Sequence, residues 1–241
     1  MLFRSGCFVL PNPWDVGSAR RLERSGFAAL ATTSAGFAWS VGRADGDVSR
    51  DEVLGHLRTM CAATSLPVNA DFEAGFADAP EGVAANVRLA VATGVAGLSI
   101  EDRVGTELYD LPVAKARIRA AREAIDATGE DVMLIARSEG FLIGRTQLSL
   151  TIERLVAYAD AGADCLYAPG IRDPKMLAEV VAAVAPKPVN ALLLPGMVVT
   201  ELAAAGVRRI SVGSALAAAS WAAFDRAVVR LMDEGTVPPR D

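Results

Sequence analysis

The chain has 241 residues, of which 52% are hydrophobic and 22% are charged, and its formal net charge is −5. This length and apolar content suit a large globular core, whereas the scattered basic residues and 6% aromatic content argue against a nucleic-acid-binding surface. No apolar run approaches the roughly 18 residues of a membrane span, and the first residues lack a signal-peptide pattern. We therefore expect a cytoplasmic protein with neither a nucleic-acid nor a membrane partner.

Short apolar strands alternate with helical patterns along the whole chain. The sequence predicts strands at residues 8–11, 28–33, 68–71, 97–101, 132–137, 165–168, 189–193 and 209–212. It predicts helices at residues 15–25, 49–64, 80–93, 114–128, 148–161, 173–184, 198–205 and 214–234. Several strands, such as 132–137, are apolar nearly throughout, which indicates parallel strands buried on both faces. Eight such units predict an α/β fold, a (β/α)8 barrel of the TIM type that forms one domain over residues 1–241.

Two further patterns bear on this architecture. An open doubly wound sheet is the alternative fold, but no Gly-x-Gly-x-x-Gly follows the first predicted strand. The last predicted helix, 214–234, is apolar nearly all round, and such a helix must be covered on more than one face. We therefore expect this helix at a subunit interface.

The single histidine restricts the chemistry. His56 lies in a polar segment that is predicted to be helical, so we expect it on the surface. A Ser-His-Asp hydrolase and a His-ligated zinc enzyme are thereby disfavoured. The three cysteines are well separated and have no metal-ligand spacing. Any catalysis is therefore expected from carboxylates, Arg, Lys, Tyr, Ser or Thr.

The strongest candidate site follows the third predicted strand. Asp71 and Glu73 are two residues apart, so on an extended chain they point to the same side. Their like charges repel unless a cation lies between them or one carboxylate is protonated. Taken alone, they are better explained as solvated loop residues, but Glu101 ends the neighbouring predicted strand. An oxygen-only set of this kind suits Mg²⁺.

Other polar residues fall at the same end of the predicted barrel, where barrel enzymes carry their chemistry. Arg137 ends the fifth predicted strand and can hold a substrate carboxylate in a bidentate grip. Ser34, Ala35 and Gly36 follow the second strand and can offer backbone N–H groups to the same anion. Asn190 lies on the seventh strand and is a further candidate for substrate binding.

Two more carboxylates near these strand ends have a different expected role. Asp102 follows Glu101, and we expect it to be buried or to cap a loop. Glu139 follows Arg137 by two residues, and we expect it to hold the arginine in place.

Five stretches of the chain together resemble the isocitrate lyase/phosphoenolpyruvate mutase superfamily. They are Leu-Pro-Asn-Pro-Trp-Asp at 10–15, Thr-Ser-Ala-Gly at 33–36, Asp-Phe-Glu-Ala-Gly-Phe at 71–76, Ser-Ile-Glu-Asp at 99–102 and Ala-Arg-Ser-Glu-Gly-Phe at 136–141. The resemblance implies a Mg²⁺ cofactor, with Mn²⁺ as the alternative, surrounded by Asp71, Glu73 and Glu101. It also implies that Arg137 and the turn at 34–36 bind the substrate anion, and that Asp45 contacts the reacting group.

The resemblance implies an activity and an assembly as well. Members act on enolates of 2-oxo acids: they cleave or form C–C bonds, decarboxylate, or hydrolyse or rearrange C–P bonds. They are typically tetramers that exchange their last helices, which agrees with the apolar helix at 214–234. We therefore expect a homo-oligomer, a tetramer or a dimer.

The loop after the fourth predicted strand departs from the family pattern. Lyases carry Lys-Lys-Cys-Gly-His there and mutases carry Lys-Lys-Asn, whereas residues 103–110 of this chain contain no Cys, Lys or His. The family's histidine after strand six is also replaced, by Ala-Pro-Gly at 168–170. The chain thus resembles a branch with Thr-Glu-Leu-Tyr-Asp in this loop. Tyr109 is a candidate proton donor in place of the cysteine, the alternative being a packed or solvent-facing tyrosine.

These observations predict a Mg²⁺-dependent lyase-type enzyme. Its substrate would be a small 2-oxo or 2-hydroxy carboxylic acid, cleaved or formed at a C–C bond through a pyruvate-like enolate. Two alternatives stay open. One is a phosphonomutase or a phosphonate C–P hydrolase of the same superfamily, and the other is a non-catalytic protein that binds a 2-oxo acid.

Overall fold

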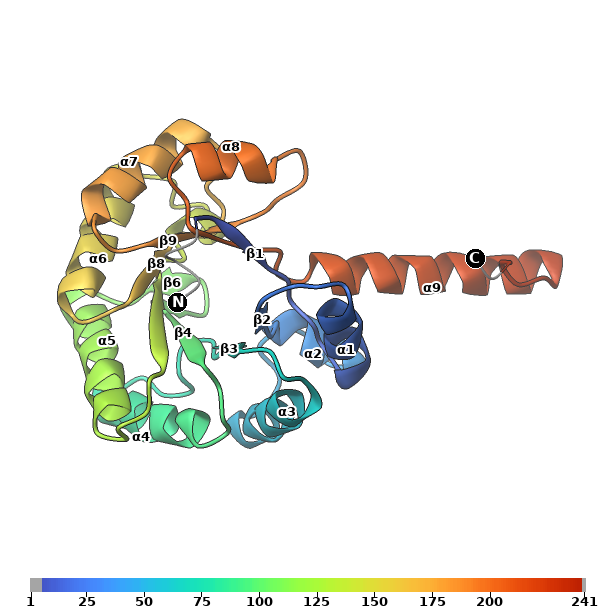
Figure 1. Cartoon of the computed structure of the whole chain (residues 1–241), viewed down its shortest axis with the longest axis horizontal. Coiled ribbons are helices and arrows are strands. Elements are labelled where there is room, and N and C mark those ends of the chain that lie inside the picture. Colours follow the sequence, from blue (N-terminus) through green and yellow to red (C-terminus); the bar gives the residue numbers. More distant parts are fainter. Residues whose placement is uncertain (1–5, 240–241) are drawn as a thin grey trace.

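The computed structural model describes residues 6–239, and in this range eight parallel strands form a nearly closed barrel (Figure 1). The strands are β1 (Phe8–Leu10), β2 (Leu30–Ala31), β3 (Val68–Asp71), β4 (Gly97–Glu101), β7 (Met133–Arg137), β8 (Cys165–Tyr167), β9 (Val189–Leu192) and β10 (Arg209–Ser211). Their order is β1-β10-β9-β8-β7-β4-β3-β2. Between β1 and β2, the two ends of this order, the Ala31 N–H donates to the Pro11 carbonyl at 3.0 Å. The predicted (β/α)8 barrel is confirmed.

Helices surround the barrel in the predicted order (Figure 1). They are α1 (Val16–Arg24), α3 (Arg50–Ala63), α4 (Pro80–Val91), α5 (Leu111–Asp126), α6 (Leu148–Asp160), α7 (Pro174–Val184) and α8 (Val199–Ala204). Their starts agree with capping chemistry, since Ser49 and Glu52 form the expected capping box at α3. No helix in residues 6–239 is both long and apolar enough to cross a membrane.

Three short elements were not predicted. They are helix α2 (Ser34–Ser40), the hairpin of β5 (Arg103–Val104) and β6 (Glu107–Leu108), and the 3₁₀ turn Gly140–Ile143. Helix α2 begins where only a turn was expected, because the Thr33 hydroxyl accepts from the Gly36 N–H at 3.3 Å and caps its first turn. Elements of two to seven residues leave too few positions for a periodic pattern to be recognised.

Helix α2 also corrects the expectation that His56 lies on the surface. The His56 ring stacks on Phe37 of α2, with centroids 3.9 Å apart, and the side chain is half-buried. Burial lowers the pKa of His56 to about 4, so the imidazole is neutral at physiological pH. The surface expectation was wrong because it took no account of α2, which covers this face of α3.

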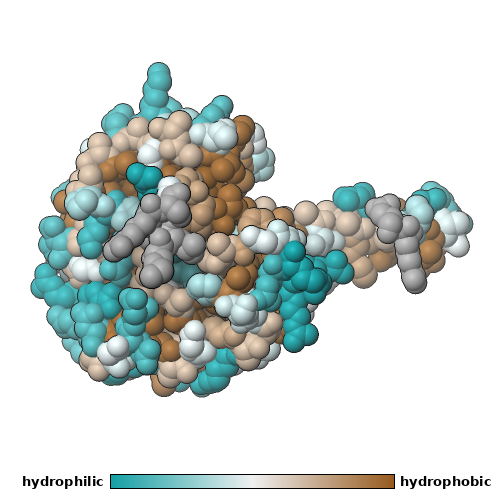
Figure 2. All heavy atoms as spheres, in the orientation of Figure 1, coloured by the Kyte–Doolittle hydropathy of each residue, from teal (hydrophilic) through white to brown (hydrophobic). Residues whose placement is uncertain are grey.

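Helix α9 (Ala215–Glu234) extends away from the barrel (Figure 1). Ala217 is the one residue of this helix that is buried, whereas Phe224 is 58% exposed and Met232 is 80% exposed. In the same orientation, Figure 2 shows hydrophobic residues along α9 and on the barrel surface beside its base. The predicted apolar helix is therefore present, and its apolar side chains face solvent in the single chain.

Candidate active site at the carboxyl ends of the strands

Two cavities at the carboxyl ends of the strands share Ser34 and Asp45 in their walls. The inner cavity, of about 170 Å³, is also lined by Ala35, Asp71 and Arg137. The outer cavity, of about 560 Å³, is also lined by Glu73, Glu101 and Tyr109. The structure thus brings together eight of the ten residues that the sequence marked for metal, substrate or catalysis.

Arg137 lies at the centre of the site, between three carboxylates. Its Nη1 is 2.7 Å from Asp71 Oδ1 and 3.6 Å from Glu101 Oε1. Its Nε donates to Glu139 Oε1 at 2.9 Å, which confirms that Glu139 holds the arginine. Strand pairing aligns these groups, because Glu101 and Arg137 are register partners in β4 and β7. The neighbouring carboxylates raise the pKa of Arg137 against the effect of its burial, so the guanidinium is permanently charged.

The site contains more carboxyl groups than Arg137 can neutralise, and two of them resist ionisation. Burial, followed by the charges of Asp71 and Asp45, raises the pKa of Glu73 to about 7. Burial raises the pKa of Glu101 to about 8, although Arg137 acts in the opposite direction. Groups that resist ionisation in this way would ionise readily beside an added cation. The oxygen-only set therefore fits a hard divalent cation chemically.

The same carboxylates do not form a complete protein cage. Among residues 6–239, no three carboxylate, imidazole or thiol side chains are arranged so that they could hold a metal ion. Mg²⁺ commonly takes only one or two protein carboxylates and completes its shell with water and substrate oxygens. An open set of Asp71, Glu73 and Glu101 agrees with that mode of binding and not with a closed structural site.

The loop that carries Glu73 is strained. Glu73 has φ 47° and Phe76 has φ 55°, and non-glycine residues rarely adopt this left-handed conformation. Buried Arg117 stabilises the loop, because its guanidinium donates to the carbonyls of Ala74, Ala77 and Asp78. Strain of this kind concentrates where a side chain must point in a given direction, which agrees with Glu73 facing the outer cavity.

Tyr109 lies on the wall of the outer cavity and has a carboxylate partner. Its hydroxyl donates to Asp78 Oδ1 at 2.5 Å, and the Arg117 guanidinium lies 4.1 Å from its ring centroid. Burial and the hydrogen bond to Asp78 raise the pKa of Tyr109. The phenol is therefore neutral at physiological pH and can donate a proton but not accept one.

The predicted anion-binding turn is the first turn of α2. The Ser34 N–H donates to Asp71 Oδ2 at 3.1 Å, so this expected anion-binding donor contacts a carboxylate of the protein. Ala35 lines the inner cavity, whereas Gly36 does not. A Cβ at Gly36 would lie 2.7 Å from the Thr33 side chain and 2.9 Å from that of Trp14, so glycine is needed there for packing.

Two other residues lie outside both cavities. Asn190 is fully buried in the barrel, where its side chain donates to Ser211 Oγ at 3.0 Å and accepts from Arg209 Nε at 2.9 Å. Asp102 is buried as expected: its carboxylate accepts from the Glu139 N–H at 2.8 Å and from the Tyr158 hydroxyl at 2.6 Å. Asn190 thus hydrogen-bonds Ser211, which lines the inner cavity, and Asp102 hydrogen-bonds the backbone of Glu139, which holds Arg137.

Sequence reasoning missed several residues of the cavity walls. The inner cavity includes Asn12, Thr32, Ser99, Tyr167, Arg209 and Ser211, and the outer cavity includes Asp78 and Arg103. Thr32 was detectable, because it is a polar residue at the end of an apolar strand. Asn12 was not detectable, because its contacts are with residues far away in the sequence. It accepts from the Val212 and Gly213 N–H groups, each at 2.9 Å, and donates to the Thr32 carbonyl, so it links the loops at the carboxyl ends of the strands.

The fold and the site define a class of protein. A (β/α)8 barrel with buried carboxylates and an arginine at the carboxyl ends of its strands has the architecture of a barrel enzyme. The chain belongs to the phosphoenolpyruvate phosphomutase family, whose model matches residues 2–232.

Similar proteins fall into more than one enzyme class. A Burkholderia cenocepacia J2315 structure, provisionally named a lyase/mutase, is 48% identical, with TM-score 0.94 over 98% of this chain and 89% of that one. Oxaloacetate acetylhydrolase, solved with the product oxalate, is 30% identical, with TM-score 0.91 over 100% of this chain and 87% of that one. The 2-methylisocitrate lyase of Escherichia coli K12 is 33% identical over 67% of this chain and 57% of that protein. The relatives therefore include lyases as well as phosphomutases.

Proposed function

We propose that the protein is a metal-dependent lyase-type enzyme that cleaves or forms a C–C bond of a small 2-oxo or 2-hydroxy carboxylic acid through a pyruvate-like enolate. The observation that carries the proposal is the position of Arg137, a buried cation beside a surplus of carboxylates. Further support comes from a related structure, an oxaloacetate acetylhydrolase with bound oxalate, since that enzyme's named substrate is a 2-oxo acid.

Each side chain of the site has a role in this proposal. Asp71, Glu73 and Glu101 would hold Mg²⁺ or Mn²⁺, which would supply a Lewis acid for a developing oxyanion. Arg137 would bind the substrate carboxylate in a bidentate grip. To do so, its guanidinium must give up part of its contact with Asp71, in which Nη1 lies 2.7 Å from Oδ1. To bind the same anion, the Ser34 N–H would likewise have to give up its hydrogen bond to Asp71.

Proton transfer would be carried out by residues of the outer cavity. Tyr109 is protonated at neutral pH and would donate a proton to the enolate carbon, which keeps the electron pair of the broken C–C bond. Asp45 lines both cavities and would contact the reacting group where the two cavities meet. Asn190 would position the floor of the site through Ser211, to which it donates a hydrogen bond.

We also propose that a second copy of the chain covers α9. Trp221 and Phe224 pack edge to face on the helix, with centroids 5.9 Å apart, and both are exposed in the single chain. Exposed apolar surface of this extent marks an interaction site. Because the chain's own barrel leaves most of α9 uncovered, a homo-oligomer, dimer or tetramer, would bury it.

Product analysis by mass spectrometry tests the enzymatic proposal. The protein is incubated with a panel of 2-oxo and 2-hydroxy acids and with phosphonopyruvate, each with Mg²⁺ or with EDTA. We expect C–C cleavage of at least one acid that requires Mg²⁺ and is abolished by Asp71→Ala, with Asp51→Ala as the control because Asp51 is a 77%-exposed carboxylate on α3. Conversion of phosphonopyruvate alone would establish C–P chemistry instead. Binding of an acid without any conversion would establish a binding protein.

A further inference from the structure

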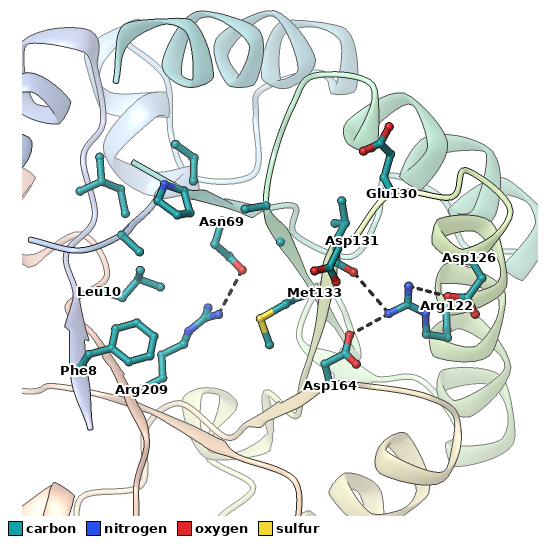
Figure 3. A pocket seen from close by; sticks show the side chains of 17 residues that line it. Phe8, Leu10, Asn69, Arg122, Asp126, Glu130, Asp131, Met133, Asp164 and Arg209 are labelled. Carbon is teal, nitrogen blue, oxygen red and sulfur yellow. Dashed lines mark hydrogen bonds and ion pairs between the residues drawn. The ribbon is translucent and has the colours of Figure 1, made fainter. Parts of the chain in front are cut away.

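A second large cavity lies at the opposite end of the barrel from the candidate active site. It has a volume of about 870 Å³ (Figure 3). Six of its lining residues are each the first residue of a barrel strand: Phe8, Leu30, Val68, Gly97, Met133 and Arg209. The cavity is therefore formed by the amino ends of the strands, whereas the chemistry of a barrel enzyme belongs to their carboxyl ends.

The floor of this cavity is a buried arginine without an acidic partner. Arg209 is only 5% exposed, and its guanidinium points across the cavity toward Asn69 (Figure 3). Its Nε donates to Asn190 Oδ1 at 2.9 Å and its Nη1 to Asn69 Oδ1 at 3.3 Å, both neutral acceptors. Within residues 6–239, Arg209 forms no ion pair and its Nη2 donates no hydrogen bond. Burial lowers the pKa of Arg209, and the charge of Arg137 acts in the same direction.

A buried cation of this kind is unusual. Removing a charge from water costs several kcal/mol unless a counter-ion compensates it. A guanidinium presents a planar set of donors that matches a carboxylate, and one end of that set is free here. The other arginine of the cavity differs in this respect, because Arg122 is paired with Asp126 and Asp164 at 2.8 Å each. Arg122 therefore has counter-charges within the chain, whereas Arg209 has none among the described residues.

The remaining walls restrict the kind of anion. Leu10 and Met133 lie beside Arg209 and offer apolar surface (Figure 3). Farther out, the cavity is lined by Glu130 and Asp131, which are exposed carboxylates without an ion-pair partner among the described residues. A ligand with a second negative charge would meet these carboxylates, so a single charge on an apolar body fits best.

We propose that the amino-terminal mouth of the barrel binds a monocarboxylate with a short aliphatic chain. The carboxylate accepts hydrogen bonds from Arg209, and the chain lies along Leu10 and Met133. The apolar part of this site lies at the amino ends of the strands, away from the candidate active site, and the inference does not rest on the proposed function. Arg209 also lines the inner active-site cavity, and Asn69 donates to the Ala70 carbonyl next to Asp71.

Isothermal titration calorimetry with butyrate, hexanoate and adipate tests the proposal on the full chain. Hexanoate is expected to bind up to about 15-fold more tightly than butyrate, because two more methylenes are buried. Adipate has the length of hexanoate with a second carboxylate, and we expect it to bind at least about tenfold more weakly than hexanoate. Equal affinity for butyrate, hexanoate and adipate, or no binding of any of them, would overturn the proposal.

Variants locate the binding. Arg209→Gln is expected to weaken hexanoate binding at least about tenfold. Arg208→Gln is the matched control, since it removes the adjacent but exposed arginine, and it should leave the affinity unchanged. Asp71→Ala should also leave it unchanged, which separates this site from the candidate active site.

A second variant covers the case in which Arg209→Gln fails to fold. Met133→Trp adds bulk to a half-buried position on the cavity wall and should weaken hexanoate binding about tenfold while the fold persists. Hexanoate affinity that survives Met133→Trp but is lost in Asp71→Ala would place the ligand in the active site and refute the inference.

Discussion

Arg137 and Asp71 form the closest ion pair of the candidate active site, with 2.7 Å between Nη1 and Oδ1. Both side chains are largely buried, at 13% and 17% exposed. The arginine comes from β7 and the aspartate from β3, so the pair spans β4, which lies between these strands. It joins the expected anion-binding group and an expected metal ligand in one contact.

Removing the cation of this pair should destabilise the fold. Arg137→Gln leaves Asp71, Glu101 and Glu139 without their shared counter-charge, and loss of a buried partner typically costs about 3–5 kcal/mol. Urea denaturation at pH 7.5 measures the effect. The matched control is Arg145→Gln, which breaks an exposed pair with Glu107 and should cost less than about 1 kcal/mol. Equal losses for the two variants would show that Arg137 does not neutralise the site.

The stability of the metal-free protein should fall as pH rises from about 5 to about 8. Glu101 has a pKa near 8 in the folded chain and an ordinary value near 4.5 when unfolded, so between these values the folded state binds the extra proton. Each unit of pKa difference is worth about 1.4 kcal/mol, and we expect a loss of at least ~1 kcal/mol over this range. Denaturation curves at pH 5, 6.5 and 8 in EDTA measure it. The slope should be shallower in Glu101→Gln, and a wild-type stability that rises with pH would contradict the assignment.

Glycine at position 73 should stabilise the protein while weakening the site. The φ of 47° at Glu73 is strained for any residue with a Cβ, and relief of that strain is worth up to about 1 kcal/mol. Glu73→Gln separates the backbone effect from the loss of charge, because it keeps the Cβ. Glu81→Gly is a control with the opposite expected sign, because glycine in the first turn of α4 should lower the stability of the protein. Thermal unfolding of the three variants measures the differences, and a Glu73→Gly variant less stable than Glu73→Gln would refute the strain argument.

Arg117→Lys should loosen the loop that carries Glu73. Lysine keeps the charge but cannot reach the carbonyls of Ala74, Ala77 and Asp78 together, so we expect a loss of about 2–3 kcal/mol. Hydrogen–deuterium exchange should become faster across residues 73–78. Arg119→Lys, on the exposed face of α5, is the control and should change neither quantity. Unchanged exchange in Arg117→Lys would show that other contacts hold the loop.

The surface of α9 should determine the oligomeric state. Wild-type protein is expected to sediment as a dimer or tetramer, and Phe224→Asp should shift it toward smaller species by placing a charge in the buried interface. Analytical ultracentrifugation measures both, with Arg226→Ala on the same helix as the control. A monomeric wild-type protein would contradict the proposal that a second copy covers α9.

Much of the fold could be predicted, and for a definite reason. Strands such as Val68–Asp71 and Gly97–Glu101 appear with the predicted bounds, because each is an apolar run between clear turn signals. Topology then brought Asp71, Glu101 and Arg137 together, since the carboxyl ends of parallel strands meet at one end of a barrel.

The unpredicted parts depend on contacts between distant segments. Neither the stacking of His56 on Phe37 nor the placement of Asn190 behind the cavity has a local pattern. The sequence also did not predict that Arg137 would occupy the space beside Asp71. That contact depends on side-chain conformation and not on strand order.

The central claim is that Asp71 and its neighbours bind a divalent cation and a 2-oxo acid together. Thermal unfolding with oxalate, pyruvate or oxaloacetate, each in Mg²⁺ and in EDTA, tests it most directly. We expect a rise of ~5 °C or more with at least one acid, at a concentration about 100-fold above its Kd, only in Mg²⁺ and not in Asp71→Ala. A rise that is equal in Mg²⁺ and EDTA, or no rise with any acid, would contradict the claim.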